Sequence, residues 1–171
     1  MFEEINEIPL CGISQRLHWD YTYFTINGIM WYFWALKCAI TKAIVGWIIT
    51  CTKSIDDAKA SLLKAKHTFP VVYELKEIVS DGEPSFPRAI WEVFDHSVKH
   101  YRYKGFRDKK NNNLIETLWR FKNHVPEFRT PEQANRFFAM WVALYNIGKL
   151  KHLQGSVEVY NLKKALILRH F

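Results

Sequence analysis

The chain has 171 residues, of which 49% are hydrophobic and 16% aromatic, and its formal net charge is +7. A chain of this length forms one domain that buries roughly 70% of the surface its unfolded form exposes. The composition excludes a disordered segment, a collagen-like repeat and a small disulfide scaffold. The three cysteines are widely spaced, so we expect reduced, buried thiols of an intracellular protein.

The most hydrophobic stretch, residues 29–51, is long enough to raise the question of a membrane span. Lys37 and Lys42 would then lie near the bilayer centre, where each charge costs about 2.5–3.5 kcal/mol. The first residues of the chain are acidic, unlike a signal peptide. We therefore expect a cytoplasmic protein without a membrane partner.

The first half of the chain predicts three antiparallel strands and a helix. Residues 17–25 alternate with the period of a strand, and Asn27-Gly28 is a strong hairpin signal because both turn positions need positive φ. Residues 29–36 and 43–50 follow as the second and third strands. A helix is expected over residues 54–67, with a serine as its N-cap and two aspartates in its first turn.

The second half predicts strands that alternate with helices. The expected strands are residues 74–79 and 97–103, and the expected helices are residues 87–94, a segment from residue 114 and a long helix from Thr130. The order βββαβαβαα predicts an α/β domain with a mixed five-stranded sheet flanked by helices.

The positive charge lies in the C-terminal half. Residues 1–98 hold 9 lysines and arginines against 12 acidic residues, whereas residues 99–171 hold 15 against 5. Within residues 99–129 the net charge is +6, and aromatic side chains are interleaved with the basic ones. Such a mixture suits a nucleic acid, whose phosphates attract cations and whose bases stack; the alternative is an ordinary solvated surface.

Three carboxylates occupy notable positions. Asp20 lies in the middle of the first strand among large aromatic residues, where a charge is costly unless it is paired or bound to a metal. Asp81 lies at the carboxyl end of a later strand, where α/β sheets commonly place ligands. Glu116 lies in the first turns of a helix within the basic segment. Taken singly, each of them fits a solvated surface residue or a helix cap better than a catalytic residue.

Together with their neighbours these residues resemble the DDE catalytic domain of insertion-sequence transposases. The resemblance is closest to the bacterial and archaeal branch, in which 34 residues separate the second aspartate from the glutamate, as they do here. The motifs that carry it are Trp19-Asp20-Tyr21-Thr22-Tyr23, Asn27-Gly28, Ser80-Asp81-Gly82, Asn112-Asn113-Leu114-Ile115-Glu116, Phe128-Arg129-Thr130-Pro131-Glu132 and Tyr145-Asn146.

The resemblance implies an RNase H-like fold, shared with retroviral integrases. It implies a single domain over residues 1–171, with a core at about residues 17–146 and a C-terminal extension over residues 147–171. Full-length relatives carry a DNA-binding region before this domain, and only 16 residues precede Leu17 here. We therefore expect that the N-terminal DNA-binding domain is absent.

The resemblance also implies an enzyme that cleaves DNA strands and transfers them, which is transposition. Two Mg²⁺ ions, with Mn²⁺ as a substitute, would be held by Asp20 as the bridging ligand and by Asp81 and Glu116 as ligands of one ion each. The implied partners are element ends, target DNA and further copies of the chain, in a homodimer or larger synaptic oligomer. The implied location is the nucleoid of a prokaryotic cell.

A further set of basic and amide side chains is expected to contact DNA. Two of them, the asparagines, lie one helical turn before Glu116 and would orient it or touch DNA, and Arg120 would either pair with Glu116 or contact DNA. Trp119 is expected in the hydrophobic core. The expected DNA contacts are Lys109, Lys110, Asn112, Asn113, Arg120 and Lys122.

Some positions depart from the family pattern. Lys37 stands where relatives commonly have an aspartate, Tyr21 where an acidic residue is frequent, and residues 148–150 where an aromatic-Arg-Pro-like stretch is usual. The alternative function is therefore a truncated or domesticated copy that binds DNA or a partner without catalysis. Another RNase H-like nuclease is a more distant alternative.

Overall fold

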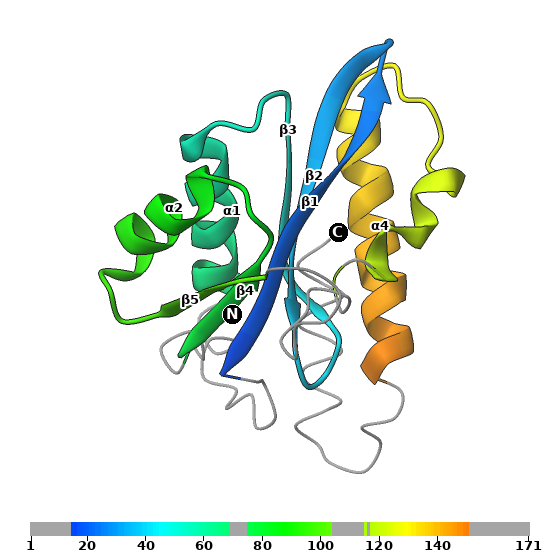
Figure 1. The fold of residues 1–171 in the computed structure, drawn as a ribbon. Coiled ribbons are helices and arrows are strands. Elements are labelled where there is room, and N and C mark those ends of the chain that lie inside the picture. Colours follow the sequence, from blue (N-terminus) through cyan, green and yellow to red (C-terminus); the bar gives the residue numbers. More distant parts are fainter. Residues whose placement is uncertain (1–14, 69–74, 104–114, 116, 151–171) are drawn as a thin grey trace, which may run out of the picture.

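The computed structural model describes residues 15–68, 75–103, 115 and 117–150, which form one mixed sheet with helices on both faces (Figure 1). The strands are β1 (Arg16–Ile26), β2 (Ile29–Cys38), β3 (Ile44–Thr50), β4 (Glu77–Ser80) and β5 (Lys99–Arg102). The helices are α1 (Ile55–Thr68), α2 (Ser85–Phe94), the 3-10 helix η3 (Thr117–His124) and α4 (Pro131–Leu150). The predicted mixed five-stranded sheet flanked by helices is confirmed.

The strands are arranged in the order β3-β2-β1-β4-β5. β1, β2 and β3 form the predicted antiparallel meander, whereas β4 pairs in parallel with β1, and β5 with β4. The turn between β1 and β2 has φ of 52° at Asn27 and 73° at Gly28, as an Asn-Gly hairpin requires. β1 is therefore central: β2 follows its length on one side, and β4 pairs with it at Arg16–His18 on the other.

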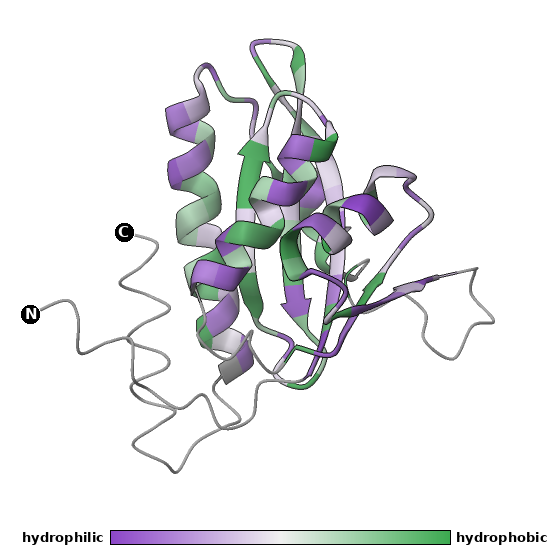
Figure 2. Cartoon of the chain, turned by 90° about the vertical axis from the view of Figure 1, so that its left-hand side faces the viewer, coloured by the Kyte–Doolittle hydropathy of each residue, from purple (hydrophilic) through white to green (hydrophobic). Residues whose placement is uncertain are grey.

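Side chains of β1 alternate between two hydrophobic cores, one on each face of the sheet. The first core lies under α1 and α2, where the ring of Trp19 stacks on Phe86 with centroids 4.0 Å apart. The second lies under α4 and η3, where Phe33 stacks on Phe138 at 4.4 Å. Figure 2 shows hydrophobic and hydrophilic residues alternating around the helices, as expected where one face of a helix packs on a sheet.

Two helices begin at the caps that the sequence indicates. At α1 the backbone N–H of Asp57 donates to Ser54 Oγ (3.2 Å), and the N–H of Ser54 donates back to Asp57 Oδ2 (2.9 Å). At α4 the N–H of Gln133 donates to Thr130 Oγ1 (3.3 Å), and Pro131 occupies the first helical position. These local bonds satisfy N–H groups that have no partner within the helix.

The structure differs from the sequence predictions at several boundaries. β4 begins at Glu77 and α2 already begins at Ser85, two residues before Pro87. The segment after residue 114 forms a 3-10 helix from Thr117, with Pro126 close behind it; proline cannot donate the next backbone hydrogen bond.

The cysteine prediction is correct for one residue only. Cys38 is buried at the end of β2. Cys51 is exposed, because it directly follows β3 where the chain leaves the sheet. Cys11 lies outside the described residues.

The hydrophobic stretch of residues 29–51 forms β2 and β3 inside the domain. Lys37 is buried, with its ammonium 5.5 Å above the ring of Tyr145. Burial, together with the charges of Lys149 and Lys42, lowers the pKa of Lys37 to about 8. In the part of the chain that the structure describes, a helix with the length and apolar character to cross a membrane is not found.

The contact between β3 and α1 leads to a stability prediction. A Cβ at Gly46 would lie 2.7 Å from Ala65 Cβ and 2.8 Å from Ala65 Cα, so Gly46→Ala should lower the free energy of unfolding by about 1–3 kcal/mol as α1 moves away. Gly148→Ala in α4, where no atom lies within 4 Å, should leave stability unchanged or raise it by up to about 1 kcal/mol. Urea unfolding measures both, and equal stability of the two variants would contradict the close packing.

Candidate active site

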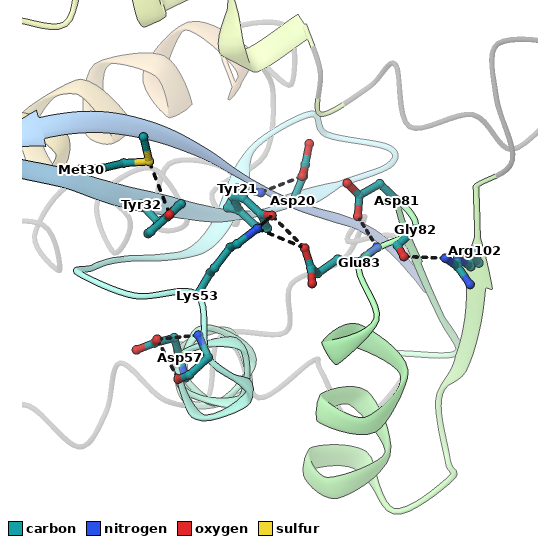
Figure 3. Close-up of polar contacts among 11 residues, drawn as sticks. Asp20, Tyr21, Met30, Tyr32, Lys53, Asp57, Asp81, Gly82, Glu83 and Arg102 are labelled. Atoms are coloured by element: carbon teal, nitrogen blue, oxygen red, sulfur yellow. Dashed lines mark hydrogen bonds and ion pairs between the residues drawn. The ribbon is translucent and has the colours of Figure 1, made fainter.

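Asp20 and Asp81 lie on neighbouring parallel strands at the same level. The pairing of β1 with β4 places His18 beside Val79, and the same register continued by two residues places Asp81, just past the end of β4, beside Asp20. Neighbouring strands are about 4.8 Å apart, and side chains at the same level point to the same face. Figure 3 shows the two carboxylates, one from β1 and one from the end of β4.

Both carboxylate oxygens of Asp20 accept hydrogen bonds. The backbone N–H of Tyr21 donates to Oδ1 (2.8 Å), and the indole N–H of Trp119 donates to Oδ2 (2.9 Å). Trp119 belongs to η3, and its ring meets Phe33 edge-on in the second core, with centroids 6.1 Å apart. The carboxylate of Asp20 therefore faces the side of the sheet that η3 covers, and its orientation is fixed by two donors.

Asp81 begins the turn from β4 to α2. Its Oδ1 accepts a hydrogen bond from the backbone N–H of Glu83 (3.1 Å), a turn that aspartate favours. The preceding Ser80 is buried, and its Oγ lies 2.7 Å from Nε2 of His100 on β5. Burial and the charge of Arg102 lower the pKa of His100, and the charge of Asp81 acts in the opposite direction. Asp81 is thus held by its own turn, directly after a serine that is bound to β5.

Tyr21, next to Asp20, forms a polar cluster with Glu83 and Lys53 (Figure 3). The Tyr21 hydroxyl donates to Glu83 Oε2 (2.9 Å), and Lys53 Nζ lies 3.8 Å from the same oxygen. Burial raises the pKa of Tyr21, as do the hydrogen bond to Glu83 and the charges of Glu83, Asp81 and Asp20, so the phenol remains a neutral donor. Tyr21 and Glu83 therefore each bind one aspartate through a backbone N–H and bind each other through their side chains.

Several of the predicted site residues lie outside the described part of the chain: Lys109, Lys110, Asn112, Asn113 and Glu116. Ile115 is helical and buried in the second core, and η3 begins at Thr117. Among the described residues, no three histidine, cysteine, aspartate or glutamate side chains are grouped so that they could hold a metal ion. The described part of the site is the aspartate pair with its hydrogen-bond donors.

The two described basic residues of the predicted set lie on η3. Arg120 is exposed. Lys122 places its ammonium 3.1 Å from the centre of the Tyr23 ring, and this contact lowers the pKa of Tyr23. Both side chains are therefore on the same element as Trp119, which contacts Asp20.

The contacts of three side chains at the site were not predicted from the sequence: those of Trp119, Tyr21 and Glu83. Trp119 packs against the second core as predicted, but its indole N–H also binds Asp20, which is 99 residues away in the sequence. The pairing of Tyr21 with Glu83 spans 62 residues. The one local signal is that Glu83 follows Asp81 by two residues, the position whose N–H an aspartate turn binds.

The sheet, the helices on both faces and the aspartate pair define an α/β domain of the RNase H-like class. The family model described as a DDE domain matches residues 14–151, most of the chain. The chain therefore belongs to the DDE transposase domain family. No curated protein sequence matches this chain.

Solved structures of retroviral integrase cores share this fold. The HTLV-2 integrase catalytic core with magnesium, in its trimeric form, has a TM-score of 0.51 and 12% identity, covering 91% of this chain and 84% of that chain. The BIV integrase catalytic core has a TM-score of 0.50 and 11% identity, covering 88% and 94%. These likenesses establish the RNase H-like fold that the resemblance implied.

The chain spans about half of a longer relative. A simian T-cell lymphotropic virus intasome chain matches with a TM-score of 0.48 and 13% identity, over 71% of this chain and 47% of that chain.

The bond between Trp119 and Asp20 can be tested by its effect on stability. Trp119→Phe keeps an aromatic ring beside Phe33 but removes the donor to Asp20, and hydrogen bonds to charged groups contribute about 1.5–3 kcal/mol. Trp141→Phe is the matched control, because Trp141 stacks on Phe121 in the same core. The free energy of unfolding in urea should fall by more in Trp119→Phe, and equal losses would show that the bond adds no stability.

Proposed function

We propose that this domain catalyses metal-dependent cleavage of DNA strands and their transfer to target DNA, with Asp20, Asp81 and Glu116 as its catalytic carboxylates. The observation that carries the proposal is the register of β1 and β4, which sets Asp20 beside Asp81. A second support is the bond from Trp119 to Asp20, because Trp119 follows Glu116 by three residues in the sequence.

The chemistry of the donor set fits Mg²⁺. Carboxylate oxygens are the ligands that hard divalent cations prefer, and two carboxylates at one level of neighbouring strands repel each other unless a cation lies between them. When bound, two Mg²⁺ ions would stabilise the attacking and leaving oxygens of an in-line displacement at phosphorus. We infer that Asp20 would be shared by both ions, with Asp81 and Glu116 each holding one and Mn²⁺ able to replace Mg²⁺.

The surrounding residues keep the carboxylates in place. Trp119 and the backbone N–H of Tyr21 orient Asp20, and the N–H of Glu83 orients Asp81. Lys53 lies beside Glu83 and offsets the additional negative charge near the aspartate pair. Preorganised ligands of this kind reduce the rearrangement that a reaction at phosphorus would require.

We further propose that the basic segment positions DNA at these carboxylates. Lys122 and Arg120 lie on the element that contacts Asp20. The other proposed contacts are Lys109, Lys110, Asn112 and Asn113, the asparagines one turn before Glu116 in the sequence. Because two element ends must be joined to one target, we propose a homodimer or larger synaptic assembly acting on DNA in the prokaryotic nucleoid.

Amide variants test the catalytic carboxylates. Asp20→Asn, Asp81→Asn and Glu116→Gln keep the side-chain shape but remove a charged metal ligand, so the rate should fall by about 100-fold or more. The substrate is a branched DNA that mimics the product of strand transfer, with a 3′-hydroxyl next to the junction where one strand is joined to another. The reverse of strand transfer can be followed on this DNA, and it does not require recognition of element ends. Products are resolved on denaturing gels in Mg²⁺ and in Mn²⁺.

Asp95→Asn provides the matched control, because Asp95 is an exposed carboxylate at the end of α2 in a left-handed conformation that asparagine also adopts. It should retain the wild-type rate. Activity that persists in all three site variants would overturn the assignment of the carboxylates. A wild-type protein that binds the DNA and never cuts it in either metal would favour the non-catalytic binding module.

The basic segment is tested by the salt dependence of DNA binding. Lys109→Ala with Lys110→Ala should weaken binding to any duplex alike and flatten the slope of log K against log salt by about 0.9 for each lost phosphate contact. The control pair is Lys64→Ala with Lys76→Ala, two exposed lysines on α1 and before β4. Fluorescence anisotropy with a labelled duplex measures both, and an identical slope in the two double variants would place the DNA elsewhere.

A further inference from the structure

A hollow of about 480 Å³ opens beside β1 near the end of the β1–β2 hairpin. It lies between β1 and the segment that follows η3, which Figure 1 shows running beside that end of the hairpin. Its lining combines an aromatic ring, both signs of charge and small or apolar groups. The lining residues are Tyr23, Phe24, Thr25, Gly28, Lys122, Val125, Pro126 and Glu127.

The hollow lies along the same edge of β1 as the aspartate pair. On this edge β4 pairs with β1 as far as His18, and the next backbone contact among the described residues is the bridge from Ile26 to Phe128. Asp20 lies near one end of this interval, and Tyr23 lies three residues further along. The side chain of Tyr23 starts on the face of β1 opposite to that of Asp20, because side chains alternate along a strand, but Lys122 on η3 contacts its ring at this edge. At about 3.3 Å per residue the separation is roughly 10 Å, or about three base steps of stacked DNA at 3.4 Å each.

The exposed ring in the hollow carries a cation. Tyr23 is 50% exposed, and Lys122 Nζ lies 3.1 Å from the centre of the Tyr23 ring. An aromatic face stacks on any nucleobase, and a lysine beside it binds the phosphate of the same nucleotide.

We propose that this hollow binds an unpaired nucleobase of the DNA strand that runs past Asp20, with the base stacked on Tyr23 and its phosphate held by Lys122. Lys122 then moves from the ring to the phosphate, which frees the face for the base. Glu127 lines the same hollow and repels phosphate, so the backbone lies on the side of Lys122. The inference rests on the proposed function, because it takes DNA as the substrate.

Binding in the absence of metal tests the stacking directly. The probe is a fluorescent forked DNA with a five-nucleotide single-stranded arm, measured by anisotropy in EDTA so that no strand is cut. Tyr23→Ala should weaken binding by roughly 5- to 150-fold, the effect of one base stacked on an aromatic side chain. Tyr23→Phe keeps the ring and should stay within about twofold of wild type. The control Trp91→Ala removes another ring of similar exposure, 53%, on α2, and should have no effect.

The two charges of the hollow give effects of opposite sign. Lys122→Ala should weaken binding and flatten the slope of log K against log salt by roughly 0.7 to 0.9, the value for one lost phosphate contact. Glu127→Gln should tighten binding at low salt. Thermal unfolding of each variant confirms that the domain remains folded.

An abasic scan of the single-stranded arm identifies the stacked base. One abasic position should weaken wild-type binding as much as Tyr23→Ala does and should cause no further loss in that variant, because both changes remove the same contact. Unchanged binding of Tyr23→Ala would overturn the inference. It would also be overturned if, at every abasic position, the loss of binding in Tyr23→Ala were as large as the loss in the wild type. Cleavage is measured separately: a wild type that never cuts but shows the Tyr23 coupling contradicts the proposed catalysis alone.

Discussion

The parallel pairing of β1 with β4 is the constraint on which the site depends. It extends over only three residue pairs, yet it places Asp20 and Asp81 at one level. A slip by one residue would turn one carboxylate to the opposite face of the sheet, because side chains alternate along a strand. The slip is opposed by Arg16 and Glu77, which are paired directly across the two strands and form an ion pair with a nitrogen–oxygen distance of 3.1 Å.

Local signals in the sequence were sufficient for much of the fold. The Asn27-Gly28 turn, the caps at Ser54 and Thr130 and the alternation along β1 are each decided by residues within a few positions of one another. The expectation that Asp20 and Asp81 act together came from the family resemblance, because each aspartate alone also fits a solvated surface residue. The family resemblance supplied the RNase H-like class of the fold.

The parts that the sequence could not predict depend on contacts between distant segments. Trp119 was expected in the core on the basis of helical spacing, and its ring is there, but spacing cannot reveal that the indole N–H reaches Asp20. The η3 segment is a 3-10 helix where an α-helix was expected. The bond of Tyr21 to Glu83 likewise joins a strand to a turn that only the folded sheet brings together.

The long sequence separation of the contacts at Asp20 and Asp81 has a consequence for synthesis of the protein. Asp20 is made early in translation, Asp81 joins it only when β4 docks, and the indole of Trp119 follows 99 residues after Asp20. Non-local pairings of this kind form slowly and late in folding, after the loop-closure entropy has been overcome. A nascent chain that ends before β4 therefore holds Asp20 without Asp81, and the aspartate pair forms only once β4 has docked on β1.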